Sequence, residues 1–289
     1  MQDLNYSIKK VCDRNRDGSH ATRSNRERML SQCATQVRAL GFKDAKTVHG
    51  LKAKHVHRLV ESWQKEGISI GTIKNRMSAL RWLAEKAGNS KWIKPSNDHY
   101  GIGNRVYVTN LDKSLKFGKQ QIDAIAHVYV RASALLQREF GLRREEAMKC
   151  QPVYADRGTS LVLKDSWCKG SREREIPIRT ESQREALANA HKVAGTGSLI
   201  PRDKSYVQHV RTYENQMAKA GLSRTHGARH GYAQERYRDL TGRECPARGG
   251  KTSAELSRAE KEQDREARLQ ISRELGHERE SITSSYLGR

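Results

Sequence analysis

The chain has 289 residues, of which 35% are hydrophobic, so it is long enough for one large or two modest domains and apolar enough for compact cores. Its 55 Lys and Arg against 33 Asp and Glu give a net charge of +22, which favours a polyanionic partner such as nucleic acid, although a merely basic or ribosome-associated protein has the same balance. No apolar run approaches the ~18 residues of a membrane span, and the polar start is no secretory signal, so we expect no membrane partner.

The cysteines also limit the class of protein. There are five of them, scattered and without a Cys-x-x-Cys pair, which argues against a disulfide framework and a zinc ribbon. We therefore expect a reducing cytoplasm.

The first third of the chain predicts a small helical domain. We expect residues 1–20 to be flexible and residues 21–93 to form a helical DNA-binding domain. Apolar residues at helical spacing predict helices over 22–40 and 54–65, and a third that starts at an N-cap, Thr72, and ends at Gly88. Its outward side chains are candidate DNA contacts, although a solvated charged face is an equally good explanation for any one helix. These candidates are Lys74, Asn75, Arg76 and Arg81.

The remainder predicts a linker and a second domain, giving a mainly α fold with a small antiparallel β-hairpin (α+β). Pro, Gly and Asn interrupt the pattern over 94–117, which we interpret as the linker to a domain over 118–289. A densely charged segment, 243–268, is expected to be a surface helix or a mobile excursion. The other expected elements are helices over 119–148, 182–193 and 206–220, and a hairpin of strands 160–163 and 173–178 with its turn over 165–171.

The first candidate site element pairs an arginine with a carboxylate. Arg143 lies two positions after Gly141, and Glu146 lies three positions after Arg143 on the same helix face. A guanidinium held by a carboxylate can offer its other donors to two phosphate oxygens. By itself the pair is a weak signal, because many helices carry such pairs in solvent.

The second element is a lysine on the predicted hairpin turn. Lys169 can reach into a groove, and its ammonium can hand a proton to a departing alkoxide, which an arginine cannot do. For an isolated hairpin, a lysine on a polar turn would be the better explanation.

The third element is a His-x-x-Arg box. His226 and Arg229 project together from a helix, so one phosphate could meet both a proton acceptor and a second cation. His226 and His230 have the spacing of a helical zinc pair, but no Glu follows His226 and no third ligand is evident. We interpret His230 as a packing histidine or one that supports its catalytic neighbours.

The last element lies near the end of the chain. Gly276 precedes His277, and Tyr286 follows nine positions later, so a helix over 279–287 would place the tyrosine about two turns on. A tyrosine hydroxyl loses its proton only near pH ~10, so it becomes a nucleophile only beside a neutralised phosphate and a proton acceptor.

In this order the set resembles the tyrosine recombinase (phage integrase) family, whose signature is an Arg box, a hairpin Lys, a His-x-x-Arg box, a Gly-His pair and a C-terminal Tyr. The resemblance covers residues 118–289 by motif and 20–92 by architecture, since that family has a helical core-binding (SAM-like) domain ahead of its catalytic domain. Any one box arises readily by chance, but the ordered set is highly specific.

The resemblance implies the reaction and the main roles. Tyr286 would attack the scissile phosphate and leave a 3′-phosphotyrosyl bond and a free 5′ hydroxyl. Arg143 and Arg229 would hold the non-bridging oxygens, and Lys169 would protonate the leaving oxygen. No metal and no cofactor is required, because the arginines supply the charge.

The remaining roles and partners follow from the same resemblance. His226 would accept or relay the proton of the nucleophile, His277 would bond the phosphoryl group and Glu146 would steady Arg143. Arg144 and Arg172 are further candidate DNA contacts. The expected partners are double-stranded DNA, other copies of the chain in a tetramer, and accessory DNA-bending proteins. The expected location is the bacterial cytoplasm, in association with the nucleoid.

We therefore predict a site-specific recombinase that integrates or excises a mobile element. Two alternatives stay open: a type IB topoisomerase-like enzyme, and a non-catalytic DNA-binding accessory factor on the same scaffold. The chain departs from the family pattern by the charged insertion near 243–268 and by the three residues that follow Tyr286. The target DNA sequence is not encoded in any motif that we can read.

Overall fold

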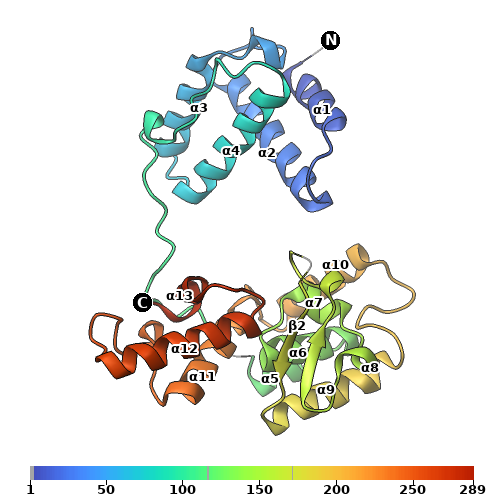
Figure 1. Ribbon diagram of the computed structural model, residues 1–289. Coiled ribbons are helices and arrows are strands. Elements are labelled where there is room, and N and C mark those ends of the chain that lie inside the picture. Colours follow the sequence, from blue (N-terminus) through green and yellow to red (C-terminus); the bar gives the residue numbers. More distant parts are fainter. Residues whose placement is uncertain (1–2, 116, 171) are drawn as a thin grey trace. The chain divides into compact units, whose positions relative to one another are not determined.

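The computed structural model describes residues 3–115, 117–170 and 172–289 (Figure 1). The chain divides into two compact units, residues 1–106 and 107–289. Both are built mainly from helices, and the second also contains an antiparallel hairpin, so the predicted fold class is confirmed. Within the described ranges, no helix is both long and apolar enough to cross a membrane.

The N-terminal unit is a helical bundle. Its helices close around a core that contains Leu30, Trp63 and Met77, and α2 contacts α1, α3 and α4 (Figure 1). The helices expected over 22–40 and 54–65 are confirmed within two residues at either end, whereas the third is capped by Ser69 rather than Thr72. The helices are α1 (Leu4–Arg14), α2 (His20–Ala39), α3 (Ala53–Lys65) and α4 (Ile70–Lys86).

The expectation of a flexible terminus over 1–20 is wrong for α1. The Asp3 carboxylate accepts a hydrogen bond from the Tyr6 amide at 2.9 Å and so starts this helix. Leu4 and Ile8, one turn apart, are buried in the bundle core. Leu4, Ile8 and Val11 have helical spacing, but a run of eight residues is too short to identify a helix by pattern alone, and packing against α2 stabilises the helix.

The linker expected over 94–117 is too long at both ends. Tyr100 and Ile102 are buried in the core of the N-terminal unit, and Phe117 belongs to a core of the second unit. Arg81 donates hydrogen bonds of 2.9 Å to the Lys94 carbonyl and to Asn97, which fixes this stretch on α4. Between these anchored ends the chain runs without helix or strand over 103–110.

The second unit is built around α6 and α11. α6 contacts α9, and α11 contacts α6, α12 and α13, so residues far apart in sequence meet beside α11 (Figure 1). The helix expected over 119–148 is divided into three. The elements are α5 (Lys119–Asp123), α6 (Val128–Phe140), α7 (Arg144–Lys149), α8 (Pro152–Ala155), β1 (Ser160–Leu163), β2 (Arg174–Pro177), α9 (Glu181–Ala194), α10 (Tyr206–Lys219), α11 (Gly227–Thr241), α12 (Arg258–Glu274) and α13 (Ser284–Leu287).

The hairpin is confirmed as antiparallel, with Leu163 opposite Arg174 and Leu161 opposite Ile176. Side chains alternate along β2, so Arg174 and Ile176 are buried while Glu175 is exposed. An arginine therefore points from the hairpin into the protein.

The charged segment near 243–268 is not a mobile excursion, because most of its helical part belongs to α12, which packs on α11. The Arg268 side chain is 1% exposed and donates to both Asp264 oxygens at 2.9 and 2.8 Å and to the Gly288 carbonyl at 3.0 Å. The Tyr237 hydroxyl of α11 donates to Asp264 at 2.6 Å. The segment thus connects α11 to the C-terminal residues.

Arg268→Ala tests this connection. Because it leaves Asp264 without its buried cation and Gly288 without its donor, we expect the free energy of unfolding of the second unit to fall by about 3 kcal/mol. Arg265→Ala, on the same helix with a side chain that is 71% exposed, should change it by less than about 0.5 kcal/mol. Urea denaturation of both variants gives the comparison, and equal small effects would contradict a structural role for α12.

Candidate active site

The centre of the site is the carboxylate of Glu146, which is 1% exposed on α7. Its Oε1 accepts from Arg143 Nη1 at 2.7 Å and from Arg174 Nη1 at 3.0 Å, and its Oε2 accepts from the Arg143 amide at 2.7 Å and from Arg174 Nη2 at 2.7 Å. Arg229 Nη1 lies 4.0 Å from Oε2. Despite burial, which raises a carboxyl pKa, the Arg174 guanidinium above all brings the pKa of Glu146 down to about 2.

The charges in this cluster do not cancel. Arg143, Arg174 and Arg229 carry three positive charges and Glu146 carries one negative charge, which leaves an excess of two positive charges. A cluster of this kind is a preorganised site for an anion.

Arg143 is held by local backbone geometry. It is the N-cap residue of α7, directly after the turn that ends α6 at Gly141 and Leu142. Gly141 has φ +60°, and a Cβ there would lie 2.8 Å from the Tyr232 ring, so the turn requires glycine for conformation and for space. Gly141 therefore fixes the turn from which the Arg143 side chain projects.

Arg229 is fully buried near the start of α11. Its Nη1 donates to the Gly141 carbonyl at 2.7 Å, and its Nη2 donates to the Leu275 carbonyl. These carbonyls end α6 and α12, where helix dipoles favour a cation. Burial lowers the pKa of Arg229 to about 10, so the guanidinium is still charged at neutral pH.

Tyr286 lies on α13 beside this arginine. Its hydroxyl accepts a hydrogen bond from Arg229 Nε at 3.2 Å, and Gln234 of α11 donates to its carbonyl at 3.2 Å. The His230 ring contacts the Tyr286 ring edge to face at 4.9 Å, whereas the His226 ring lies 6.1 Å away. The structure thus brings together Arg143, Arg229 and Tyr286 through one connected set of contacts.

Three histidines of the site have lowered pKa values, which favours their neutral forms at pH 7. Burial and the nearby arginines Arg229 and Arg143 lower the pKa of His226, and they lower the pKa of His277 to about 4. Burial and then His226 lower the pKa of His230 to about 4. Because a guanidinium only donates, His277 Nε2 accepts the 3.3 Å contact from Arg143 Nη2. Neutral His226 is free to accept a proton.

Lys169 is placed by the hairpin but not brought to the cluster. It is exposed in the turn between β1 and β2. It forms no hydrogen bond or ion pair with any described residue. Ser171, at the other end of the predicted turn, lies outside the described residues.

Arg174 is the site residue that the motif analysis missed. The sequence carries a signal for it, since in an alternating strand Arg174 must share the inward face with Ile176. No spacing rule identifies its carboxylate partner, because Glu146 is 28 residues away and meets it only in the folded protein.

The candidate DNA contacts differ in their surroundings. Asn75 is exposed and Lys74 is partly exposed, whereas Arg76 is buried with its guanidinium 5.0 Å from the centre of the Trp63 ring. The assignment of Arg76 to DNA is therefore wrong, because its outward position on the predicted helix is covered. Arg81 holds the stretch after α4, as described above. Arg144 and Arg172 form exposed ion pairs with Glu214 and Glu278.

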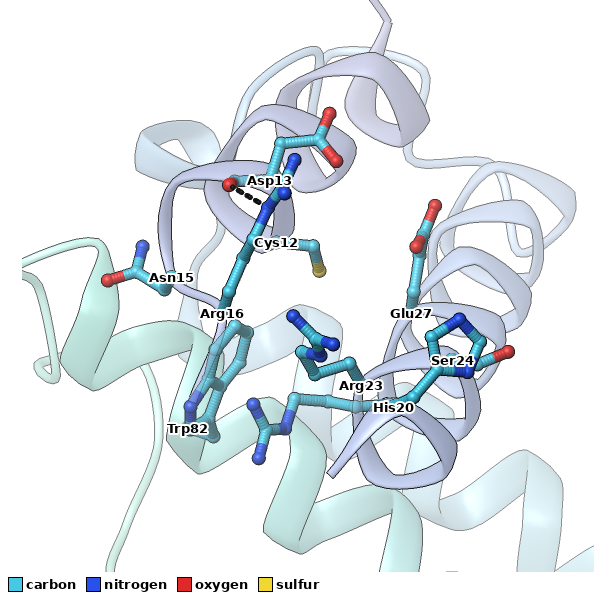
Figure 2. A pocket seen from close by; sticks show the side chains of 10 residues that line it. Cys12, Asp13, Asn15, Arg16, His20, Arg23, Ser24, Glu27 and Trp82 are labelled. Atoms are coloured by element: carbon cyan, nitrogen blue, oxygen red, sulfur yellow. Dashed lines mark hydrogen bonds between the residues drawn. The ribbon is translucent and has the colours of Figure 1, made fainter. Parts of the chain in front are cut away.

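A cavity of about 330 Å³ lies in the N-terminal unit between the end of α1, the start of α2 and Trp82 of α4 (Figure 2). Arg26 stacks 4.0 Å from the Trp82 ring centre and bonds Asp17, which also accepts from Trp82 Nε1. Among the described residues, no ion pair involves Arg23 or His20 on the cavity wall. This recess is basic, but it contains none of the motif residues, all of which belong to the second unit.

Two family models match the chain: "Phage integrase, N-terminal" over residues 1–93 and "Integrase" over residues 110–235. Together they span most of the sequence, and the second includes the boxes from Arg143 to Arg229 but stops before Tyr286. The chain belongs to the phage integrase family of tyrosine recombinases. It is therefore an enzyme of DNA strand cleavage and transfer, and neither the topoisomerase nor the non-catalytic alternative is favoured.

Solved structures share the integrase fold. A lambda integrase dimer bound to a COC′ core site matches with a TM-score of 0.62 and 15% identity over 96% of this chain and 76% of that one. XerH site-specific recombinase bound to a palindromic difH substrate matches with a TM-score of 0.59 and 15% identity. The match covers 98% of this chain and 80% of that one. The Tn1549 transposon integrase in complex with circular intermediate DNA matches with a TM-score of 0.55 and 13% identity. The match covers 100% of this chain and 96% of that one. No curated protein sequence matches the chain.

Glu146→Gln tests the central carboxylate of the integrase. The folded pKa of about 2 lies below the value of ~4.3 for an unfolded glutamate, so the ionised group contributes stability above pH ~4.3 that is lost as the pH falls toward 2. We expect the free energy of unfolding of the wild type to exceed that of Glu146→Gln by on the order of 3 kcal/mol at pH 7. This difference should shrink below pH 4.5. Denaturant titrations over pH 3 to 7 measure it.

Glu145→Gln is the matched control, because Glu145 is the neighbouring residue but forms an exposed pair with Lys149. Its effect should stay within about 0.5 kcal/mol at every pH. A Glu146→Gln effect that is equally small would show that the carboxylate does not hold the arginines.

Proposed function

We propose that this integrase cleaves and rejoins DNA through a covalent bond between Tyr286 and a 3′ phosphate, in the integration or excision of a mobile element. The observation that carries the proposal is the hydrogen bond between Arg229 and the Tyr286 hydroxyl, in a cluster with an excess of two positive charges. Among the ordered motifs, this contact joins a cation from the His-x-x-Arg box to the candidate nucleophile.

The phosphate would enter beside Arg143, whose Nη2 has His277 Nε2 as its one hydrogen-bond partner among the described residues. A diester carries one negative charge, which the excess of the cluster more than balances, and extra charge that develops on the equatorial oxygens in the transition state is stabilised further. Arg229 is fully buried and directs Nε toward Tyr286, so it would hold the attacking oxygen beside the cluster in which Arg143 receives the phosphate. Because the tyrosine oxygen and the phosphate would already be held close together, a weak nucleophile such as a phenol can react.

Proton transfer would use groups on opposite sides of the phosphate. Neutral His226 has a ring nitrogen that can accept the Tyr286 proton, and burial and two arginines disfavour the imidazolium, so the ring would pass the proton on as a relay. Lys169, exposed on the hairpin turn, would meet the leaving 5′ oxygen once DNA is bound. The 5′ hydroxyl of another strand could then reverse the reaction, which is recombination.

Double-stranded DNA and other copies of the chain are the proposed partners. The charge of +22 suits a polyanion, and the similar lambda integrase is described as a dimer on a core site and as a tetramer on a Holliday junction. Lys74, Asn75 and the basic cavity wall at Arg23 are proposed contacts of the N-terminal unit. Accessory DNA-bending proteins would assist the assembly.

Tyr286→Phe tests the nucleophile. With a nicked duplex that carries the element's end, wild type should form a protein–DNA adduct that survives denaturation and forms equally in EDTA, because no step needs a metal. Tyr286→Phe should bind the same duplex and form none. Electrophoresis under denaturing conditions reads the adduct, and a binding titration reads the affinity.

Tyr6→Phe is the control, since Tyr6 is an exposed tyrosine of α1. It should form adduct like wild type. The proposed mechanism would be overturned if Tyr286→Phe formed the adduct, or if the wild-type adduct failed to form in EDTA. Joining of two separate duplexes would show recombination, whereas relaxation of supercoils alone would favour a topoisomerase.

A further inference from the structure

We propose that Arg174 is a positioning residue for this reaction: by gripping both oxygens of Glu146, it sets Arg143 for the phosphate and joins the Lys169 hairpin and the His277 turn to the same carboxylate. The inference rests on the proposed function. It assigns to Arg174 no contact with DNA, because the side chain is only 4% exposed.

The first argument is the geometry of the carboxylate. Each Glu146 oxygen accepts one hydrogen bond from Arg143 and one from Arg174, so its four acceptor positions are filled. Parallel bonds from both arms of a guanidinium fix the plane as well as the place of the carboxylate. Without Arg174, Glu146 would have two empty positions and a second cation, Arg229, 4.0 Å away toward which to turn.

The second argument is the place of Arg174 in the chain. It lies on β2, five residues after Lys169 and opposite Leu163 of β1, with its neighbour Ile176 fully buried. Movement of the hairpin relative to α7 would therefore break two buried, charge-assisted hydrogen bonds. Arg174 thus couples the turn that carries the proton donor to the helix that carries Arg143.

The third argument is independent of Glu146 and concerns the Gly-His pair. Gly276 has φ +72°, and a Cβ at this position would lie 2.6 Å from Arg174 Nη1 and 3.1 Å from its Cδ. The turn before His277 closes directly on the Arg174 side chain, which explains the glycine by space as well as by conformation. Arg174 therefore touches the supports of Arg143, Lys169 and His277.

A lysine could supply the charge but not the geometry. Its ammonium is a point charge without the planar fork that matches a carboxylate. Arg174→Lys therefore separates the electrostatic from the positioning contribution, and it is a milder change for folding than Arg174→Gln.

The test is single-turnover cleavage of the nicked duplex by the full chain. We expect Arg174→Gln to cleave roughly 10²-fold more slowly and Arg174→Lys to be slowed by roughly tenfold, with DNA affinity and its salt dependence as in wild type. Glu175→Gln, the exposed neighbour on β2, is the control and should cleave at the wild-type rate. Cleavage by Arg174→Lys at the wild-type rate would overturn the proposal. This test remains valid if Arg174→Gln does not fold.

Two further readouts distinguish positioning from general stability. If Arg174 acts through Glu146, the double variant Arg174→Gln/Glu146→Gln should be no slower than the slower single variant, whereas additive losses would contradict this route. In Arg174→Lys, the pKa of Glu146 should rise toward its unfolded value, so the stability lost between pH 4.5 and pH 3 in denaturant titrations should be smaller than in wild type. A loss of stability over this pH range equal to that of wild type would also count against the proposal.

These experiments distinguish failure of the inference from failure of the proposed function. A wild-type protein that forms no adduct with any site duplex fails both. A wild-type adduct that depends on Tyr286, together with normal cleavage by the Arg174 variants, fails the inference alone.

Discussion

The active site depends on one buried carboxylate surrounded by arginines. Without Glu146, three guanidinium groups could not stay close together away from water, and with it they retain an excess of two positive charges. This excess of positive charge favours an anion such as a phosphodiester. The same contacts that stabilise the fold of α7 and β2 therefore prepare the chemistry.

The C-terminal segment is the second requirement, because a nucleophile is useful only where the cations are. Arg268 of α12 bonds the Gly288 carbonyl, and Asn110 exchanges hydrogen bonds with Arg289, so the residues after Tyr286 are fixed to their own unit. Gly288 fits where a Cβ would lie 2.5 Å from Asn110. The charged segment that interrupts the family pattern thus holds the tyrosine beside Arg229 within one chain.

The sequence predicted those features whose signals are local. The periodic apolar residues identified the helices before and after the site, and alternation identified the hairpin. The ordered motif set pointed to a cluster of Arg143, Arg229 and Tyr286, which the structure brings together. Three things escaped it for physical reasons: α1 is stabilised by packing rather than by its own pattern, α12 hides a buried ion pair inside a charged run, and Arg174 meets Glu146 only after folding.

The most direct test of the central claim is to locate the covalent bond. Denatured adduct from a nicked duplex would be treated with nuclease and trypsin, and the nucleotide-bearing peptide identified by mass spectrometry. We predict a nucleotide joined through its 3′ phosphate to Tyr286 within the peptide from Glu280 to Arg289. A nucleotide on any other residue, or DNA cleaved with no linked peptide, would contradict the account.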